Sequence, residues 1–544
     1  MYTGIRTINM KKMKGIMTLI SLALAVRLFL GFLISRTTLA HVSDDENNFR
    51  SLFEHRMEMI SLPEQRSIEY CNKPGQKIEG MEGKYPDSSM KLLGTVLLIR
   101  HGDRLPISRP PAFDGHPPPG RKPCSLDPSI SPTNRMLGHF INTVKGQTAL
   151  LKKSMNPYLQ NFDLLPDTCS DVSITQSGIT QMLELGDFLR QRYVTDISNV
   201  HQDVVISTSR FARTFQSLLS FLYGFLPERF NEFVMGKIST SSSIYFCDSD
   251  LSSTPSFMTH CNCAKAKTIA QLRASFRYWD PHNPHISHLH DLLKIDERNS
   301  LKKRSFESEK KIGPTPLSVA SPSRIWDWLV SEYYCHGRPL PCLPNESIPS
   351  QTNCLNSTTI KELIHLVDKN HLRMINDFQY IKATSLAMYP FLSSINKKFH
   401  DLVKKYNYHC ASEDTSATDN NPFVWILSGH DITIGPLFVA LDIPLLKKAP
   451  YASRVAFELW VSCDKSDNNC CYSHEIKPYV RILLNGKDVT DNIGHCGAKT
   501  NWEFPDTQRT KQNRPCPLSY FNEFINYNFL KRFNSTNYED ACQS

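Results

Sequence analysis

Three short polar clusters, far apart in the chain, contain the side chains whose types and spacing could carry out chemistry. The first is the stretch of residues 100–106, RHGDRLP. A histidine between two arginines suits a phosphate, because guanidinium groups donate paired hydrogen bonds to its oxygens and neutralise its charge. A neutral imidazole can attack phosphorus in line, while its second nitrogen needs an acceptor that fixes the tautomer. The cluster therefore indicates phosphoryl chemistry, with His101 as nucleophile and Arg100 and Arg104 as phosphate ligands, and Gly102 allows a close backbone approach.

The other two clusters supply groups of the same kind. Residues 209–214 (SRFART) can add a third guanidinium, and residues 428–431 (SGHD) supply His430 as a phosphate donor. The carboxyl group of Asp431 could protonate the leaving oxygen. Alone, an Arg-His-Gly stretch is usually a surface turn, and a lone His-Asp pair is usually a capping feature. It is the occurrence of all three clusters, each after an apolar run, that favours a catalytic site.

The apolar run before each cluster predicts a strand. Residues 95–99 (TVLLI), 204–206 (VVI) and 423–427 (FVWIL) are short and continuously apolar, which is typical of strands buried on both faces of a sheet. In open α/β sheets, ligands bind outside the carboxyl ends of the strands. We therefore expect the three clusters to meet at one edge of a sheet.

The intervening sequence predicts an α/β fold. A helix is expected over residues 175–193, with an apolar stripe along one side and Thr175 as its N-cap. Alternation of strands and helices indicates crossover connections. Residues 455–459 alternate in polarity, and residues 479–484 run into an Asn-Gly pair that signals a hairpin. We predict a mixed, mostly parallel sheet flanked by helices.

A different pattern extends from about residue 240 to 405, and we interpret it as an inserted helical cap that includes a helix near residues 360–375. Its histidine-rich stretch comprises Asp280, His282, His285, His288, His290 and Asp291. These residues are expected in a Pro-containing loop without the regular spacing of a metal site. Neither a metal nor a cofactor is predicted. The charged run at 302–311 favours a solvated face over a glycan contact, and the Pro-rich stretch at 109–123 is expected to be a loop.

The clusters resemble those of the histidine acid phosphatases, a family of the histidine phosphatase superfamily. Residues 100–106 match its RHGxRxP signature in full, residues 428–431 match its His-Asp element, and the similarity extends over about residues 92–542. The resemblance implies a phosphomonoesterase with a phosphohistidine intermediate on His101. It further implies that Asp431 is the proton donor and that phosphate is bound by Arg100, Arg104, Arg213 and His430. Arg213 is preferred to Arg210 because the family's third arginine directly precedes a threonine at this helix start.

Four stretches outside the clusters are similar to a Golgi branch of the family that removes phosphate from xylose in the proteoglycan linkage region. They are residues 221–227 (FLYGFLP), 457–460 (FELW), 480–490 (VRILLNGKDVT) and 536–542 (TNYEDAC). The resemblance implies that the substrate is 2-phosphorylated xylose in the glycosaminoglycan-protein linkage region, and it makes Golgi glycosyltransferases candidate partners. Two alternatives stay open: a general or inositol-phosphate acid phosphatase, and a non-catalytic glycan-binding module on the same scaffold. The middle region is longer than in that branch. The resemblance therefore does not identify which residues of the cap contact the substrate and select it.

The N-terminal segment predicts delivery to a secretory lumen. Basic residues precede an apolar stretch that is long enough to span a bilayer. Positively charged residues beside a membrane span keep the end of the span that they flank in the cytoplasm. Arg27 interrupts this stretch, but its apolar neighbours offset the cost of inserting it. We predict a type II Golgi membrane protein with a cytoplasmic tail (1–14), a transmembrane signal-anchor (15–34), a luminal stem (35–90) and a luminal catalytic domain (91–544). The alternative is a cleaved signal peptide that ends near Ala40.

The cysteines and the glycosylation sequons agree with a luminal protein. All 16 cysteines lie between Cys71 and Cys542, an even number without zinc-binding spacing, which favours disulfides. N-glycosylation sequons begin at Asn345, Asn356 and Asn534.

The 62 Lys and Arg residues against 53 Asp and Glu give a scattered net charge of +9, so the chain lacks the basic footprint of a nucleic-acid binder. A hydrophobic content of 40% excludes disorder over the whole length.

Overall fold

The computed structural model describes residues 63–85, 89–107, 124–127, 135–166, 169, 171–194, 204–235, 238–241, 244–246, 263–277, 280, 282–293, 321–340, 342–344, 352–411, 422–443, 445, 447–462, 477–493, 496 and 516–543. Several sequence predictions lie outside these ranges. They are the tail (1–14), the anchor (15–34), most of the stem, the loop at 109–123, the charged run at 302–311 and the sequon at Asn345.

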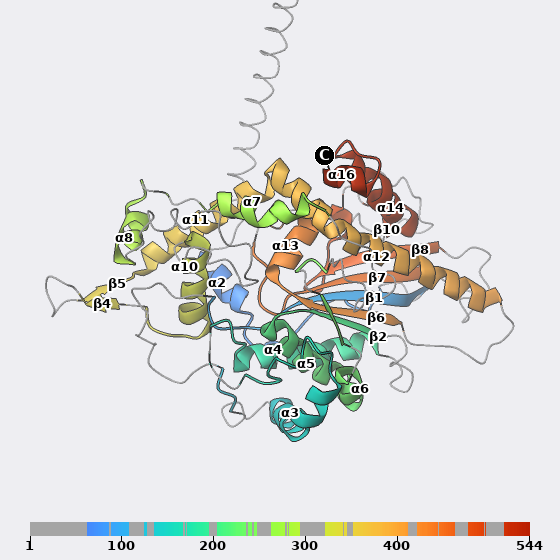
Figure 1. Ribbon diagram of the computed structural model, residues 1–544, viewed down its shortest axis with the longest axis horizontal. Helices are drawn as coiled ribbons and strands as arrows, with labels where there is room; N and C mark the ends of the chain where they lie inside the picture. Colours follow the sequence, from blue (N-terminus) through green and yellow to red (C-terminus); the bar gives the residue numbers. More distant parts are fainter. Residues whose placement is uncertain are drawn as a thin grey trace, which may run out of the picture. The chain divides into compact units, whose positions relative to one another are not determined.

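A mixed β-sheet forms the centre of the fold (Figure 1). Its strand order is β10 (Cys516–Pro517), β8 (Lys477–Leu484), β7 (Arg454–Ser462), β1 (Met90–Arg100), β6 (Phe423–Gly429), β2 (Val204–Ser209) and β3 (Ile238–Ser241), and β9 (Lys487–Asp488) pairs with β8. Strands β1, β6, β2 and β3 are parallel, whereas β7 is antiparallel to β1 and to β8, and β10 to β8. The predicted α/β fold with a mixed sheet is confirmed, and the parallel pairing is confined to one half of the sheet.

Helices cover both faces of the sheet (Figure 1). Alternate residues of β1 enter two different cores: Leu97 and Ile99 pack on one face, and Val96 and Leu98 on the other. The first face is covered by α3 (Arg135–Ser154), α4 (Gln176–Tyr193), α5 (Ala212–Phe225) and α6 (Phe230–Val234). The second is covered by α12 (Phe378–Ala411), α13 (Asp431–Ala440) and α14 (Leu518–Glu523). The strand that ends at His101 is therefore buried on both faces, as its apolar run predicts.

Two local predictions are confirmed at the level of single residues. The side chain of Thr175 caps α4 by accepting a hydrogen bond from the Gly178 N–H. Asn485 and Gly486 both adopt positive φ angles, 49° and 81°, and connect β8 to the antiparallel β9. An Asn-Gly pair tolerates this backbone conformation at low steric cost.

The described residues between β3 and β6 are mostly helical. It contains α7 (Ile269–Ser275), α8 (Pro284–Leu292), α10 (Pro322–Leu329), the π-helical turn η7 (Val330–Cys335), α11 (Ser357–Ile375) and the short strands β4 (Cys342–Pro344) and β5 (Thr352–Cys354). Helices α8, α10 and α11 share an apolar core with α2 (Pro63–Cys71). Helix α12, by contrast, begins within the predicted cap range but packs on the sheet.

The loop predicted for the histidine-rich stretch is wrong for most of it, because His285, His288, His290 and Asp291 lie in α8, whereas Asp280 and His282 precede this helix. The side chain of Asn283 accepts hydrogen bonds from the N–H groups of His285 and Ile286, which starts the helix. Across the described ranges, no group of three or more His, Cys, Asp or Glu side chains is arranged to hold a metal ion.

Five disulfides occur among the described residues: Cys71–Cys335, Cys124–Cys169, Cys263–Cys542, Cys342–Cys354 and Cys496–Cys516. Disulfides in this number are typical of domains of the secretory pathway. Within the part of the chain that the structure describes, no helix has both the length and the apolar character required to cross a membrane.

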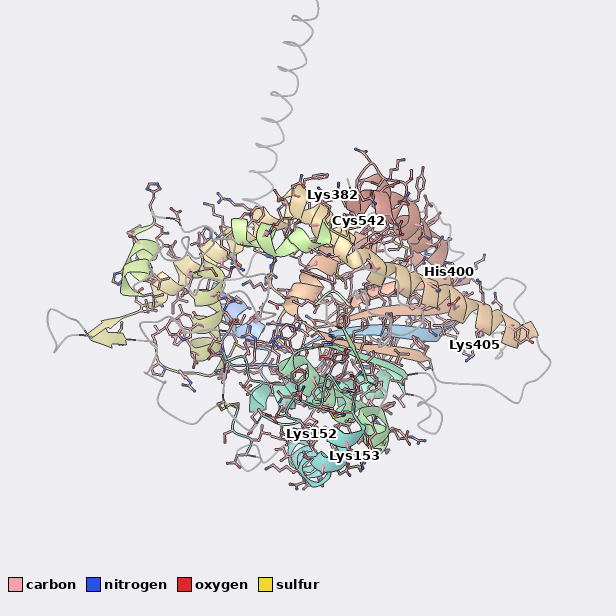
Figure 2. All side chains as sticks on the ribbon, viewed as in Figure 1. Lys152, Lys153, Lys382, His400, Lys405 and Cys542 are labelled. Atoms are coloured by element: carbon pink, nitrogen blue, oxygen red, sulfur yellow. A yellow bond between two sulfur atoms is a disulfide. The ribbon has the colours of Figure 1, made fainter. Side chains whose placement is uncertain are left out.

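Surface lysines come from separate parts of the fold (Figure 2). Lys152 and Lys153 lie in the last turn of α3, whereas Lys382 and Lys405 lie on α12, on the other side of the sheet. The labelled positive charges are thus distributed over the molecule, as their scatter in the sequence predicts.

Candidate active site

The three polar clusters meet at the carboxyl ends of β1, β2 and β6. The His101 N–H donates to the carbonyl oxygen of Gly429, and the rings of His101 and His430 lie 5.5 Å apart between centroids. Arg213 Nη2 is 3.3 Å from His430 Nδ1. Asp431 is the first residue of α13, directly after His430. The parallel pairing of β1 and β2 with β6 is what brings these residues together.

The His101 side chain is buried and held in one orientation. Its Nδ1 lies 2.8 Å from the carbonyl oxygen of Gly102, so Nδ1 carries the proton and Nε2 has a free lone pair. Burial, followed by the positive charges of Arg100 and Arg213, holds the pKa of His101 well below its usual value. The imidazole is therefore neutral, which is the protonation state that a nucleophile requires.

Gly102 is required by packing around this loop. A Cβ atom at Gly102 would lie 2.3 Å from the carbonyl oxygen of Gly178 in α4. The Gly102 N–H also donates to Ser217 Oγ at 3.0 Å. The close backbone approach predicted at Gly102 thus joins the loop at residues 101–107, which we call the catalytic loop, to the first turn of α4.

The two arginines beside His101 are buried and firmly held. Arg100 Nη2 donates to the Tyr70 hydroxyl at 2.6 Å, and its guanidinium lies 4.3 Å from the centre of the Tyr451 ring. Arg104 donates to both carboxylate oxygens of Asp327, at 2.8 and 3.1 Å. Within the described residues, the buried Nε–H groups of both arginines have no hydrogen-bond partner, and the same holds for Arg213. Such buried donors are costly unless an anion accepts from them.

The structure separates the two arginines of the second cluster. Arg213, near the start of α5, lies beside His430, and burial together with the charge of Arg104 lowers its pKa to about 9. Arg210 packs on Tyr158 instead, with 3.9 Å between its guanidinium carbon and the ring centroid. Only Arg213 is therefore placed with the predicted site residues.

His430 and Asp431 differ in their electrostatic state. His430 Nε2 lies 2.9 Å from Ser209 Oγ, and burial and the charge of Arg213 hold the pKa of His430 well below its usual value. Burial alone would raise the pKa of Asp431, but the charges of Arg100 and Lys448 outweigh burial and hold it well below its usual range. The site thus presents a neutral imidazole and an ionised carboxylate side by side.

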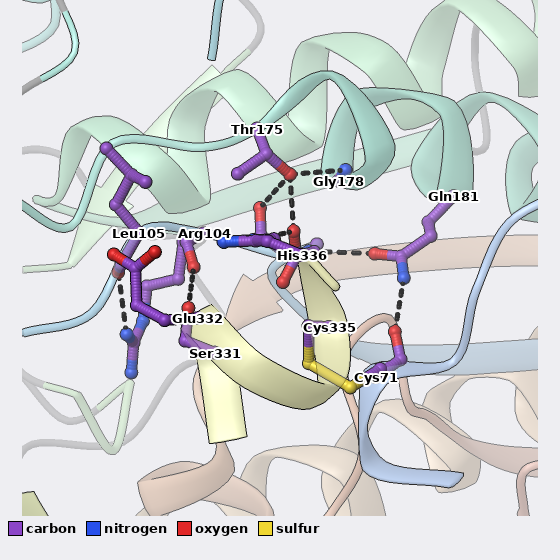
Figure 3. Close-up of polar contacts among 12 residues, drawn as sticks. Cys71, Arg104, Leu105, Thr175, Gly178, Gln181, Ser331, Glu332, Cys335 and His336 are labelled. Atoms are coloured by element: carbon purple, nitrogen blue, oxygen red, sulfur yellow. Dashed lines mark hydrogen bonds and ion pairs between the residues drawn. A yellow bond between two sulfur atoms is a disulfide. The ribbon is translucent and has the colours of Figure 1, made fainter. Parts of the chain in front are cut away.

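A second layer of polar contacts supports the catalytic loop (Figure 3). The Asp103 carboxylate accepts from the Thr175 hydroxyl at 2.5 Å and lies 2.9 Å from His336 Nε2. The Asp103 N–H donates to Gln181 Oε1 at 2.8 Å, and Ser331 Oγ donates to the Arg104 carbonyl oxygen at 3.0 Å. Helix α4 and the π-helical turn η7 therefore hold the loop from two directions.

Sequence reasoning missed several residues of this site. Some of them, Gln181, Ser331 and His336, contact the catalytic loop. The others are Tyr70, Asp327, Lys448 and Tyr451, and none of these belongs to a recognisable motif. Ser209 is the exception, since it opens the second cluster and could have been included.

Comparisons with known proteins identify the family of the chain. Residues 91–485 match the model of the histidine phosphatase superfamily (branch 2). The chain is similar to 2-phosphoxylose phosphatase 1 of Xenopus tropicalis (26% identity, covering 87% of this chain and 81% of the relative) and of Homo sapiens (25%, covering 89% and 87%). Among solved structures it is similar to the phytase from D. castellii, with 15% identity and a TM-score of 0.42 over 88% of this chain and 87% of the other. The chain therefore belongs to branch 2 of the histidine phosphatase superfamily and is a phosphomonoesterase of the histidine acid phosphatase type.

Proposed function

We propose that His101 Nε2 attacks the phosphorus of a phosphate monoester. A bond forms between Nε2 and phosphorus, the ester P–O bond breaks, and Asp431 gives its proton to the leaving oxygen. Water then attacks the phosphorus of the phosphohistidine and the Asp431 carboxylate takes a proton from that water. An O–P bond forms, the Nε2–P bond breaks with its electron pair returning to Nε2, and phosphate is released. The observation that carries this proposal is the neutral, oriented imidazole of His101, on which the positive charges of Arg100, Arg213 and Arg104 act. In the described part of the chain, the buried Nε–H group of each of these arginines has no hydrogen-bond partner.

Asp431 must be protonated when it acts as the donor. The charges of Arg100 and Lys448 depress its pKa in the absence of a bound anion. A phosphate dianion between the arginines offsets this positive charge, so binding of the ester raises the pKa of Asp431 and favours the protonated form.

Two substitutions test these roles. His101→Ala should abolish turnover, because it removes the imidazole that we propose forms the covalent intermediate. Asp431→Asn should slow an alkyl phosphate strongly and p-nitrophenyl phosphate only weakly, because a nitrophenolate needs little protonation. Equal losses for both esters would argue against Asp431 as proton donor.

The substrate that we propose is 2-phosphorylated xylose in the glycosaminoglycan-protein linkage region, dephosphorylated during proteoglycan biosynthesis. Support comes from the similarity to relatives named 2-phosphoxylose phosphatase 1, which extends over most of both chains. The proposal includes the cap near residues 240–405 as the region that contacts the sugars beyond xylose. Binding energy from those remote sugars should appear in kcat/KM.

A substrate panel tests this choice. The protein is given the phosphorylated linkage oligosaccharide, free xylose 2-phosphate and inositol hexakisphosphate, with His101→Ala as the blank. We expect kcat/KM to fall in that order. Faster release of phosphate from the inositol ester would identify a general or inositol-phosphate acid phosphatase instead.

The proposed location is the Golgi lumen, with residues 15–34 as the membrane anchor of a type II protein and residues 91–544 as the catalytic domain. The disulfides support a secretory compartment. Asn356 and Asn534 are exposed in the structure, as glycan attachment requires. Unchanged mobility after glycosidase treatment would remove the luminal assignment, and a mature N-terminus near residue 41 would replace the anchor by a signal peptide.

A further inference from the structure

The segment that connects α13 to β7 forms one wall of the phosphate site. Its Ala449 carbonyl oxygen accepts a hydrogen bond from Arg100 Nη1, and its Tyr451 ring lies against the Arg100 guanidinium. Lys448 directly precedes Ala449. Its backbone position is therefore tied to a phosphate-binding arginine.

The Lys448 ammonium lies over an aromatic ring in a partly buried place. Its Nζ is 3.9 Å from the centroid of the Trp326 ring, and within the described residues no hydrogen bond to the ammonium is found. Burial lowers the pKa of Lys448 to about 8, although the charges of Asp431 and Asp327 oppose this shift. The side chain is thus largely charged at neutral pH and keeps N–H donors for a ligand.

The position of Lys448 relative to the reacting groups is informative. The charges that act on it most strongly are those of Asp431 and Asp327, and it is among the strongest influences on Asp431 itself. In an in-line displacement, the leaving oxygen departs on the side opposite the nucleophile, which is the side of the proton donor. On the proposed function, the charge of Lys448 therefore acts close to the carboxyl group that protonates the leaving oxygen, and its backbone adjoins the Ala449 contact to Arg100.

Trp326 links this place to the phosphate site. Its ring meets the Tyr70 ring edge-on with 4.8 Å between centroids, and the Tyr70 hydroxyl accepts from Arg100. Cation–π attraction to the Trp326 ring holds an ammonium group without using its N–H donors. These donors can then bind oxygens of a substrate.

We propose that Lys448, held by Trp326, binds the hydroxyl oxygens of the alcohol part of the substrate and so selects phosphate esters of sugars over esters of simple alcohols. This inference rests on the proposed function, because it assigns the leaving group to the side of Asp431. Lys448 is a specificity residue in this scheme, since its contacts are with atoms that neither form nor break bonds.

The test compares Lys448→Met with Lys447→Met in the full chain. Lys447 is the matched control because it is the adjacent lysine, and its exposed Nζ pairs with Glu69 at 3.4 Å. Two substrates are compared, and in both the alcohol is a poor leaving group. Xylose 2-phosphate has free hydroxyl groups, whereas cyclohexyl phosphate has none. Inhibition by inorganic phosphate reports on the phosphate site alone.

For Lys448→Met we expect kcat/KM for xylose 2-phosphate to fall roughly 10- to 100-fold, the range for a lost hydrogen bond to a charged group. The kcat/KM for cyclohexyl phosphate should fall much less, because this ester reports only the loss of the Lys448 charge that acts on Asp431. Inhibition by phosphate should stay as in the wild type, and Lys448→Arg, which keeps the charge, should retain most of the activity on the sugar ester. Lys447→Met should change none of these values. If Lys448→Met does not fold, Trp326→Phe, which keeps a smaller aromatic ring, is tested instead. Its kcat/KM should fall by less than this range of roughly 10- to 100-fold, and only for the sugar ester.

Four results would overturn the inference. An equal loss for both esters would mean that Lys448 acts through Asp431. Weaker inhibition by phosphate would place Lys448 on the phosphate group, and unchanged turnover of the sugar ester would remove it from substrate binding altogether. A wild-type protein that hydrolyses cyclohexyl phosphate but not xylose 2-phosphate would refute the proposed substrate, and with it this inference, while leaving the phosphohistidine mechanism intact.

Discussion

Asp327, on helix α10, binds both terminal nitrogens of Arg104 on the catalytic loop, at 2.8 and 3.1 Å. The same carboxylate accepts a hydrogen bond from the Ile107 N–H at 2.9 Å. Both side chains are buried, so the pair fixes the plane of the guanidinium and leaves its Nε–H for another acceptor. A helix that precedes β6 by about a hundred residues thereby orients a group that we assign to phosphate binding.

Replacing Asp327 by Asn should destabilise the protein and weaken substrate binding. A buried arginine that loses its carboxylate partner costs about 3 kcal/mol of the free energy of unfolding, because its charge stays desolvated. KM for p-nitrophenyl phosphate should rise, because the orientation of Arg104 is lost. The measurements are chemical denaturation and steady-state kinetics.

Asp163→Asn is the control for that experiment, since its exposed carboxylate pairs with Lys152 at 3.5 Å on the surface. Such surface pairs contribute at most about 1 kcal/mol. A normal KM in Asp327→Asn would show that Arg104 is oriented without its partner.

The two arginines of the second cluster should differ sharply in function. Arg213→Ala should raise KM and lower kcat together, because phosphate carries negative charge in both the ground state and the transition state. Arg210→Ala should leave both constants near wild type, since its guanidinium packs on Tyr158. Kinetics with p-nitrophenyl phosphate separate the two variants, and a larger effect at Arg210 would reverse the assignment.

Stability should fall as the solution becomes acidic, and His371 should contribute to the fall. Burial lowers the pKa of His371 from 6.5 to about 4 in the folded protein. Between these values the unfolded chain binds a proton that the folded chain does not, so stability is present above pH 6.5 and is lost as pH decreases. The loss is about 1.4 kcal/mol per pH unit for one such histidine.

Thermal unfolding between pH 7 and pH 4 measures this effect. His371→Gln should flatten the dependence, because an amide can still donate to the Leu445 carbonyl oxygen, which lies 3.1 Å from His371 Nε2. The exposed His282 provides the control, and His282→Gln should leave the pH dependence unchanged. An unchanged slope in His371→Gln would contradict a neutral, buried histidine at this position.

Removing the Cys71–Cys335 disulfide should affect both stability and catalysis. The bond closes a loop with a sequence separation of 264 residues, for which chain entropy predicts about 5 kcal/mol of stabilisation. Cys71 adjoins Tyr70, and Cys335 adjoins His336, so both contacts to the catalytic loop should loosen. The paired Cys→Ser variant should therefore have a lower kcat/KM as well as a lower melting temperature.

The Cys342–Cys354 disulfide is the matched control, because it joins two short strands across a separation of 12 residues. Its removal should lower stability by about 3 kcal/mol and leave kcat/KM unchanged. If both paired variants kept wild-type kinetics, the link between Cys71 and the catalytic loop would have no functional role.

The buried strands and the clusters that follow them could be predicted because their signals are local. Residues 95–99, 204–206 and 423–427 are continuous apolar runs, and each lies within a strand of the sheet. Thr175 as a helix cap and the Asn-Gly hairpin depend on a few neighbouring residues and are confirmed as well.

Contacts that depend on the tertiary fold could not be predicted from the sequence. Asp327 lies 223 residues from Arg104, and His336 lies 233 residues from Asp103, with no motif at either position. The histidine-rich stretch contains prolines and lacks a regular helical spacing of its histidines, which favours a loop. Pro284, however, occupies the first turn of α8, where proline is tolerated. The prediction that the sheet is mostly parallel is wrong, since β7, β8 and β10 all pair in antiparallel fashion.

The central place of β1 has a consequence for biosynthesis. Both neighbours of β1 in the sheet, β6 and β7, lie in the last quarter of the chain, and Arg100 at its end donates to Ala449, 349 residues later. At roughly 5–20 residues per second, a ribosome completes these partners only tens of seconds after β1 is made. During that interval an apolar strand has both edges unpaired, which makes the nascent chain depend on chaperones and exposes it to aggregation. His101, the proposed nucleophile, is thus made early, but the site around it can assemble only when synthesis is nearly complete.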